Sequence, residues 1–173
     1  MSLQFYTLKV KDIRKETVDC VSIAFEIPRE LEKLFTFKQG QNITIKKEFN
    51  NTQIRRTYSI CSSPLDQELR IAVKKIPNGL FSNYANTILQ IGDALEIMTP
   101  TGKFHKELSA DNENSYMAFA AGSGITPIIS IIKTTLQIEK KSSFTLVYGN
   151  KNMSSKVVSY NYLDKAALVA PDK

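Results

Sequence analysis

The sequence is poor in the residues that build metal sites and disulfide frameworks. It contains two cysteines, Cys20 and Cys61, and a single histidine, His105, in 173 residues. Two distant cysteines fit neither a zinc site nor a disulfide scaffold, so no metal site is predicted and we expect a reducing, cytoplasmic setting. We expect Cys20 to be a core residue, Cys61 to be a small residue of a barrel core, and His105 to lie at the surface.

Long apolar runs and runs of one charge are also missing. No segment approaches the roughly 20 apolar residues of a membrane-spanning helix, and residues 1–10 lack the apolar centre of a signal peptide. The net charge is +6, but no run of lysines exceeds two residues, so nothing indicates a nucleic-acid-binding arm. We therefore expect neither a nucleic acid nor a membrane as partner, and only a mild attraction for anionic ligands.

The first hundred residues alternate between apolar and polar positions as β-strands do, with turn signals between the segments. The expected strands are residues 5–13, 18–27, 42–46, 55–63, 69–75 and 94–98. Residues 14–16 are expected to form a polar turn, and Asn50-Asn51 the tip of a loop. Short strands separated by turns predict a small antiparallel barrel or sandwich.

The fourth of these segments, residues 55–63, combines two arginines, a tyrosine and several hydroxyl side chains. In a strand, Arg56 and Tyr58 point to the same side. A guanidinium can hold a phosphate by paired hydrogen bonds, and a phenol ring can lie against a planar heterocycle, at whose edge Ser59 can donate a hydrogen bond. An ordinary edge strand with a surface arginine and a half-buried tyrosine fits the same spacing, because Arg-x-Tyr is short and common.

A short helix is predicted to interrupt the strands at residues 79–89. Asn78 or Ser82 can cap it, and Gly79 lets the backbone approach a ligand closely. The start of a helix with exposed amides favours anions, so a site for a phosphate group is one interpretation. A capped connector helix without a ligand is the other.

The character of the chain changes after Phe104. The expected order is a linker at 106–115, a strand at 116–121, a glycine turn at 122–127, a helix at 128–138 and a strand at 144–148. Pro127 suits the first turn of a helix, where its missing N–H costs nothing. A glycine turn between a strand and a helix can cradle a pyrophosphate, although two glycines needed only for close packing would look the same.

Taken together, five ordered motifs resemble the ferredoxin–NADP⁺ reductase superfamily over about residues 3–152. They are Arg56-x-Tyr58-Ser59-x-x-Ser62, Gly79-x-x-Ser82, Gly92-Asp93 with Pro100-x-Gly102-x-Phe104, Gly122-x-Gly124-x-Thr126-Pro127, and Tyr148-Gly149-Asn150. Within the superfamily, residues 55–64, 71–74 and 80–86 are similar to the reductase subunits of phenylacetyl-CoA epoxidases. The resemblance implies a six-stranded antiparallel flavin-binding β-barrel over residues 1–107, followed by an incomplete Rossmann-like NAD(P)-binding βαβ domain over residues 108–173.

The resemblance also implies roles for single residues. Arg56 would bind the flavin pyrophosphate, while Tyr58 would stack on the isoalloxazine ring and Ser59 would lie near its N5 atom, where hydride arrives. Thr126 would join Tyr58 and Ser59 as a catalytic residue. The full implied set of cofactor-binding residues is Arg56, Tyr58, Ser59, Val73, Lys74, Gly79, Phe81, Ser82, Asn83, Gly122, Gly124, Thr126 and Pro127.

The activity implied by the resemblance is that of an FAD-dependent NAD(P)H oxidoreductase. Such an enzyme takes hydride from NADPH or NADH and passes single electrons to an iron–sulfur or oxygenase partner, here in aromatic, phenylacetate-type catabolism. Lys151 follows the second strand of the βαβ unit, and no acidic residue replaces it, which favours NADPH. The helix carrying Ser82, as a pyrophosphate site, favours FAD over FMN.

The sequence departs from the family pattern in three respects. Gln39-Gly40-Gln41 stands where the family usually has Pro-Gly-Gln. Residues 155–173 do not follow the family pattern, although 166–170 could add one strand, so we expect a shortened nucleotide domain whose sheet leaves apolar faces uncovered. The cysteine spacing of a plant-type iron–sulfur domain is missing, so we expect the terminal electron carrier on another chain. A flavin-binding module, or a gene fragment, that has lost turnover of NAD(P)H is the alternative.

Overall fold

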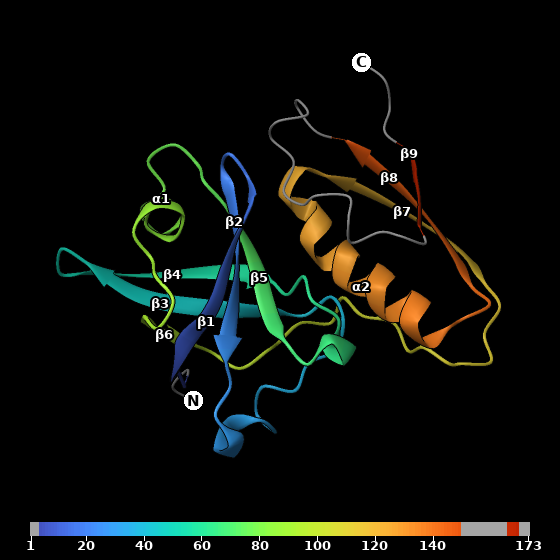
Figure 1. Ribbon diagram of the computed structural model, residues 1–173, viewed down its shortest axis with the longest axis horizontal. Coiled ribbons are helices and arrows are strands. Elements are labelled where there is room, and N and C mark those ends of the chain that lie inside the picture. The colour runs from blue at the N-terminus through green and yellow to red at the C-terminus, as the bar shows by residue number, and fades with distance from the viewer. Residues whose placement is uncertain (1–3, 150–165, 170–173) are drawn as a thin grey trace.

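The alternating segments of the first hundred residues fold into six antiparallel strands. In the computed structural model, which describes residues 4–149 and the backbone of 166–169, these strands form one sheet in the order β4-β3-β6-β1-β2-β5 (Figure 1). Their bounds are β1 (Tyr6–Thr17), β2 (Cys20–Glu26), β3 (Asn42–Phe49), β4 (Thr52–Ser59), β5 (Leu69–Lys74) and β6 (Ala94–Ile97).

The two edges of this sheet meet just beyond β4 and close it into a barrel. Ile60 forms a β-bridge with Ile71, and the amide of Cys61 donates a hydrogen bond to the carbonyl of Arg70 over 2.8 Å. Apolar side chains from alternate positions fill the interior, among them Leu8, Ile23, Ile43, Ile45, Ile71 and Ile97, each at most 1% exposed. The predicted six-stranded antiparallel barrel is therefore confirmed.

One predicted turn was wrong. Residues 14–16 belong to β1, and the chain reverses at Val18 and Asp19 instead. The polar side chains that suggested a turn have partners within the hairpin, because Arg14 pairs with Asp12 over 2.8 Å and Glu16 accepts from the hydroxyl of Ser22 over 2.6 Å. Two register shifts between β1 and β2 also disturb the simple alternation.

Three short helical segments connect the barrel strands: η1 (Arg29–Leu31), η2 (Pro64–Asp66) and α1 (Leu80–Thr87). The helix predicted near residue 80 is present, but neither Asn78 nor Ser82 caps it. Gly79 is the N-cap residue and the cap has no side-chain hydrogen bond. The hydroxyl of Ser82 turns back instead and donates to the carbonyl of Gly79 over 3.3 Å.

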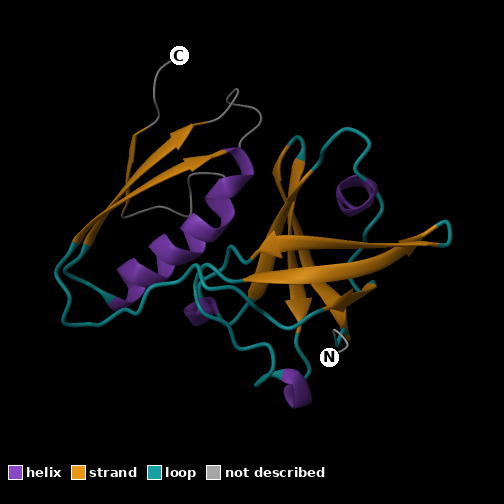
Figure 2. Ribbon diagram, turned by 180° about the vertical axis from the view of Figure 1, so that it is seen from behind, coloured by secondary structure: helices purple, strands orange, loops and turns teal. Residues whose placement is uncertain are grey.

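The second half of the chain forms the predicted βαβ unit. It comprises β7 (Ser115–Ala121), η3 (Gly122–Gly124), α2 (Ile125–Ile138), β8 (Ser143–Gly149) and β9 (Ala166–Val169). Strand β8 pairs in parallel with β7 on one side and β9 on the other. Both views show α2 between this sheet and the barrel (Figures 1 and 2). Helix α2 begins three residues earlier than predicted, because η3 leads directly into it and Pro127 falls inside its first turn.

Among the described residues, the sheet of the βαβ unit is covered on one face only. Tyr116, Ala118 and Ala120 pack with the apolar residues of α2, whereas Met117 and Phe119, on the other face of β7, are 62% and 72% exposed. Within the described residues, this face of β7 is therefore apolar and exposed. None of the helices in the described part of the chain combines the length and hydropathy that crossing a bilayer requires.

The segment that joins the two units is fixed to the barrel by a close backbone contact. Gly40 has φ +85°, and a Cβ atom at this position would lie 1.9 Å from the carbonyl oxygen of Phe104. The side-chain amide of Gln39 donates to the carbonyl of Lys106. Glycine is thus required at position 40 on two counts, backbone conformation and space.

The other end of this joining segment is held by a buried carboxylate. Glu139, at the C-terminal end of α2, has no exposed surface and accepts hydrogen bonds from the side chains of Asn112, Tyr116 and Ser142 over 2.7–2.8 Å and, at 3.4 Å, from the amide of Ser109. Burial acts to raise the pKa of Glu139, but these donors outweigh it and lower the pKa to about 2.

Replacing Glu139 with glutamine should destabilise the protein in a pH-dependent way. Because the folded pKa lies below the ordinary value of 4.5, the stabilisation by the carboxylate is complete above about pH 5 and is lost as the pH falls toward 2. We expect Glu139→Gln to lower the free energy of unfolding by about 1–3 kcal/mol at pH 7, and the difference from the wild type to shrink below pH 5. Urea titrations between pH 3 and 7 measure this. A difference that does not change with pH would contradict it.

Candidate functional site

A cleft of about 340 Å³ opens where β4, the start of α1 and the start of α2 meet. Its walls bring together eight of the residues predicted to bind a cofactor: Arg56, Tyr58, Ser59, Lys74, Gly79, Phe81, Ser82 and Thr126. These residues come from four separate elements, so the sequence places them together only through the fold.

The cleft also has walls that the sequence did not reveal. Thr57, Ala72, Ile76, Leu80 and Ser123 line it as well. Ala72 could have been found from its position two residues before Lys74 on the same strand, and Ser123 from its position between the two glycines. Ile76 and Leu80 are 55% and 50% exposed. Their positions in the sequence did not indicate a binding site, since single exposed apolar residues are common.

Five residues of the predicted set do not line the cleft: Val73, Asn83, Gly122, Gly124 and Pro127. Val73 is fully buried in the barrel core, because its side chain points away from Ala72 and Lys74. Asn83 supports the wall from behind, since its side-chain amide donates to the carbonyls of Ile76 and Gly79 over 3.0 and 2.7 Å.

An exposed cation stands at one side of the cleft. The guanidinium of Arg56 donates to the carbonyl of Arg55 over 2.8 Å, and no ion pair of Arg56 occurs among the described residues. The neighbouring Arg55 lies over the ring of Phe5, at 5.3 Å from its centroid. Arg56 can therefore give its charge to an anion in the cleft.

A neutral aromatic surface lies next to this charge. The half-buried ring of Tyr58 packs against Phe81 with a centroid distance of 5.7 Å and an interplanar angle of 43°. Burial raises the pKa of Tyr58 to about 12, although the charge of Arg56 acts in the opposite direction. The phenol therefore stays protonated at neutral pH and offers an uncharged ring for stacking.

The start of α1 forms a wall with fixed backbone geometry. Ser82 Oγ accepts a hydrogen bond from the amide of Ile76 over 3.3 Å and is itself bonded to the carbonyl of Gly79. The first amides of a helix have no acceptor within the helix and carry a partial positive charge. Together with Arg56, this wall suits a phosphate or pyrophosphate group.

The start of α2 supplies the opposite wall. Thr126 Oγ1 donates to the carbonyl of Ser123 over 3.0 Å, and the hydroxyl of Tyr148 donates to the carbonyl of Gly122 over 3.0 Å. Gly122 has φ +50°, and a Cβ atom on Gly122 or Gly124 would meet nothing within 4 Å. The turn before α2 is thus held by the hydrogen bonds of Thr126 and Tyr148, while the Cβ side of its two glycines faces open space. The nucleotide-binding role of these glycines stays a prediction.

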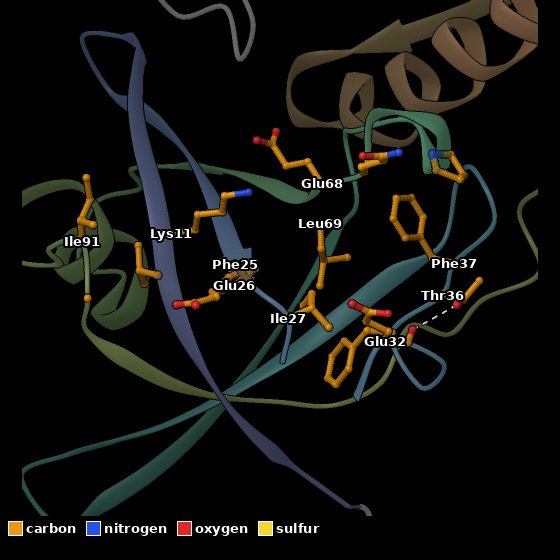
Figure 3. A pocket seen from close by; sticks show the side chains of 15 residues that line it. Lys11, Phe25, Glu26, Ile27, Glu32, Thr36, Phe37, Glu68, Leu69 and Ile91 are labelled. Carbon is orange, nitrogen blue, oxygen red and sulfur yellow. Dashed lines mark hydrogen bonds between the residues drawn. The ribbon is translucent and has the colours of Figure 1, made fainter. Parts of the chain in front are cut away.

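A larger hollow, of about 920 Å³, lies at another place on the barrel (Figure 3). Phe25, Leu69 and Phe37 are among the residues that line it, together with Glu26 and Glu32 (Figure 3). None of the predicted cofactor residues lines this hollow. Its volume exceeds that of the cleft, but the cation, the neutral ring and the helix starts are all at the cleft, which we take as the candidate site.

The remaining chemical candidates do not form a second centre. Cys20 and Cys61 are buried, and burial raises the pKa of each thiol to about 12, so neither is a nucleophile at neutral pH. Cys61 was predicted in the barrel core, but it packs with α2 in the second core cluster. His105, which was predicted to lie at the surface, is partly exposed, with 26% of its side chain accessible. Within the described ranges, no group of three or more potential ligands could hold a metal ion. Asn150 and Lys151 lie outside the described residues.

Models of two protein families match successive parts of the chain. The family described as "Oxidoreductase FAD-binding domain" matches residues 7–106, which contain the barrel. The family described as "Oxidoreductase NAD-binding domain" matches residues 119–173, which contain α2 and most of the parallel sheet.

Individual relatives agree with these matches. The chain is 45% identical to a subunit of 1,2-phenylacetyl-CoA epoxidase from Escherichia coli (strain K12), over 87% of this chain and 42% of the relative. It is 36% identical to the ferredoxin reductase component of 3-ketosteroid-9-alpha-monooxygenase from Rhodococcus rhodochrous, over 86% of this chain and 42% of the relative. The chain thus spans less than half the length of these curated relatives.

A solved structure has a similar fold over nearly the whole of this chain. Phthalate dioxygenase reductase, described as a modular structure for electron transfer from pyridine nucleotides to a [2Fe-2S] centre, superimposes with a TM-score of 0.75 at 27% identity. The match covers 96% of this chain and 51% of that one.

Adding a methyl group at Gly79 should disturb the cleft wall. A Cβ atom there would lie 2.4 Å from Ser82 Oγ and 2.5 Å from Ile76 Cγ1, so these side chains must move and the hydrogen bonds of Ser82 Oγ to the loop are disturbed. We expect Gly79→Ala to lower the free energy of unfolding by about 1–3 kcal/mol, as overpacking does. Gly124→Ala is the matched control, because its added Cβ meets open space and its φ of −63° suits alanine. Urea unfolding of both variants measures the effect, and equal stabilities would contradict the geometry described.

Proposed function

Because the chain belongs to the oxidoreductase family defined by an FAD-binding domain, here followed by an NAD-binding domain, we propose that it is the flavin-bearing part of a reductase. In this proposal it takes hydride from NADPH and delivers electrons, through FAD, to an iron–sulfur or oxygenase partner. The observation that supports the proposal most is the cleft, where residues of β4, α1 and α2 line one cavity.

The residues present in the cleft fit FAD. The flat ring of Tyr58 is neutral and lies beside a hydroxyl donor, Ser59, which suits an uncharged heterocycle. The exposed guanidinium of Arg56 and the start of α1 suit a pyrophosphate. Gly79 fits this role too, since a side chain there would fill the wall against which the phosphates would lie. A volume of about 340 Å³ falls within the range of small-molecule sites.

Each wall of the cleft then has a distinct task. Arg56 would neutralise the phosphates, and Tyr58 would orient the ring by stacking on it. Ser59 would donate a hydrogen bond at the ring edge, and Thr126, which lines the cleft from the start of α2, would face the nicotinamide. FAD, when bound, supplies the chemistry that converts a two-electron hydride into single electrons. The protein contributes alignment of two planar groups and exclusion of water between them.

The electron acceptor is proposed from the relatives. The epoxidase subunit, the monooxygenase component and phthalate dioxygenase reductase all belong, by their names, to oxygenase systems, so we propose an oxygenase or its iron–sulfur protein as partner. The identity of 45% to the phenylacetyl-CoA epoxidase subunit favours aromatic, phenylacetate-type catabolism. A cytoplasmic location is part of the proposal, and the two free thiols are consistent with it.

One observation favours a second candidate function. The face of β7 that carries Met117 and Phe119 is uncovered by the described residues, although parallel sheets normally have both faces covered. A flavin-binding module that does not turn over NAD(P)H would need only the barrel and α1. The two candidates both require FAD and differ in the reaction with NADPH.

Substitution of two neighbouring arginines, Arg56 and Arg55, tests whether the cleft binds FAD. We expect the purified protein to bind FAD, and Arg56→Gln to weaken binding about 10- to 100-fold, because charge-assisted hydrogen bonds to the pyrophosphate are lost. Arg55→Gln is the matched control, since Arg55 lies over Phe5 and should leave the affinity within about twofold. Titration of flavin fluorescence measures both. No binding of FAD by the wild type, or equal effects of the two variants, would refute the assignment of the cleft.

Hydride transfer is tested by adding NADPH to the FAD-loaded protein without oxygen. We expect the flavin absorbance to bleach within seconds, because the cleft would hold the nicotinamide and the flavin close together and in a fixed orientation. Dithionite serves as the control, because it reduces flavin without a nucleotide site. Bleaching by dithionite alone would overturn the reductase proposal in favour of the flavin-binding module.

A further inference from the structure

Helix α2 carries a stripe of polar residues that the proposed function does not use. Ser130, Lys133, Thr134 and Gln137 recur at positions three and four apart, so they share one face of the helix. Ser130 and Thr134 are 0% and 3% exposed. Buried hydroxyl groups on a helix normally have a specific partner. Ser130 bonds to the barrel, and Thr134 bonds to the carbonyl of Ser130 over 2.6 Å and also contacts the barrel.

The stripe contacts the turn that follows the flavin strand. Ser130 Oγ donates to the carbonyl of Ser62 over 2.6 Å, and Thr134 Oγ1 lies 3.1 Å from Ser63 Oγ. The hydroxyl of Ser63 donates to Gln137 Oε1 over 2.5 Å. Three consecutive turns of α2 thus reach two neighbouring residues of the barrel.

An ion pair completes the contact. Lys133 Nζ lies 2.5 Å from Asp66 Oδ2, and Gln137 Nε2 donates to Asp66 Oδ1 over 3.3 Å. Asp66 also accepts from the amide of Ser63 over 2.9 Å, as part of the capping box of η2. Burial acts to raise the pKa of Asp66, but Lys133 and these hydrogen bonds outweigh it and lower the pKa, so the carboxylate is charged at neutral pH.

This contact lies close to the cleft along both segments. Ser59, in the cleft wall, is four residues before Ser63, and Thr126, in the opposite wall, is one helical turn, about 6 Å, before Ser130. Residues 60 and 61 are fixed by the barrel closure, and α2 is continuous from residue 125. A shift of α2 at the polar contact therefore changes the distance between the two walls.

We propose that Ser62, Ser63 and Asp66 on the barrel, together with Ser130, Lys133, Thr134 and Gln137 on α2, form an interdomain latch that positions the nucleotide-binding turn over the flavin. The apolar contacts of α2 with Ala72 and Cys61 provide attraction without direction, whereas hydrogen bonds require a single orientation. Lys133 and Asp66 are positioning residues. That the latch affects hydride transfer rests on the proposed function, but that it fixes the orientation of α2 on the barrel does not.

Lys133 is the residue to vary, because its side chain is 20% exposed and borders a pocket of about 190 Å³ between barrel and helix. Lys133→Met keeps the apolar stem and removes the charge, and Lys133→Arg keeps the charge. Lys140→Gln, at an exposed site beyond the end of α2, is the control for loss of a positive charge.

The first measurement is hydrogen exchange of the protein without nucleotide. We expect Lys133→Met to accelerate amide exchange in residues 62–67 and in residues 119–126, which span the turn before α2, and Lys133→Arg and Lys140→Gln to leave both unchanged. Unchanged exchange in Lys133→Met would overturn the latch, whatever the wild-type protein does with NADPH. This readout requires neither FAD nor turnover.

The second measurement separates positioning from general structure. In the FAD-loaded protein, we expect Lys133→Met to slow reduction by NADPH about 10-fold or more, since a small misplacement of the reacting groups is costly. The affinity for FAD and the rate with dithionite should stay within about twofold, and Lys133→Arg should restore the NADPH rate. Equal NADPH rates in Lys133→Met and wild type would overturn positioning. A wild-type protein that NADPH does not reduce would refute the proposed function instead, and the exchange measurement would still decide on the latch.

Discussion

The closure of the barrel between Ile60 and Ile71 is the constraint on which the rest of the structure depends. On one side of this closure the chain lines the cleft with residues 56–59, and on the other side it turns into η2 and contacts α2. One bridge and one backbone hydrogen bond thus fix both the β4 wall of the cleft and the residues that contact α2. The cleft and the domain arrangement cannot be altered independently.

Buried charges hold the structure around this closure. Arg70, whose carbonyl takes part in it, is 4% exposed and bonds to Glu68, Asp12 and Ser22, so strands β1, β2 and β5 share one guanidinium. The carboxylate of Glu139 likewise links the end of α2 to the joining segment, but its partners are neutral donors and not cations. In both places a buried charge has several partners from different elements, which gives it a single satisfactory arrangement.

The sequence predicted the fold well where one physical pattern dominated. Alternation gave the barrel strands and the glycine turn before Pro127 gave the βαβ unit, while the motif around Arg56 indicated the cleft. Prediction failed where tertiary partners decided the outcome. Residues 14–16 continue a strand because Glu16 and Arg14 find partners in the hairpin, and Ser82 bonds to the preceding loop instead of capping its helix. The polar stripe of α2 was overlooked because the apolar spacing of the same helix already explained its position.

The position of β6 has a consequence for synthesis of the protein on the ribosome. Strand β6 is the last barrel strand in the chain, yet it pairs with β1 on one side and β3 on the other. Before it emerges, β1 and β3 lack the strand that lies between them, and β4 with β3 is joined to β1, β2 and β5 only through the closure at Ile60 and Ile71. A nascent chain therefore exposes two unpaired strand edges until residue 97 is free, and this interval is where a chaperone has the most to protect.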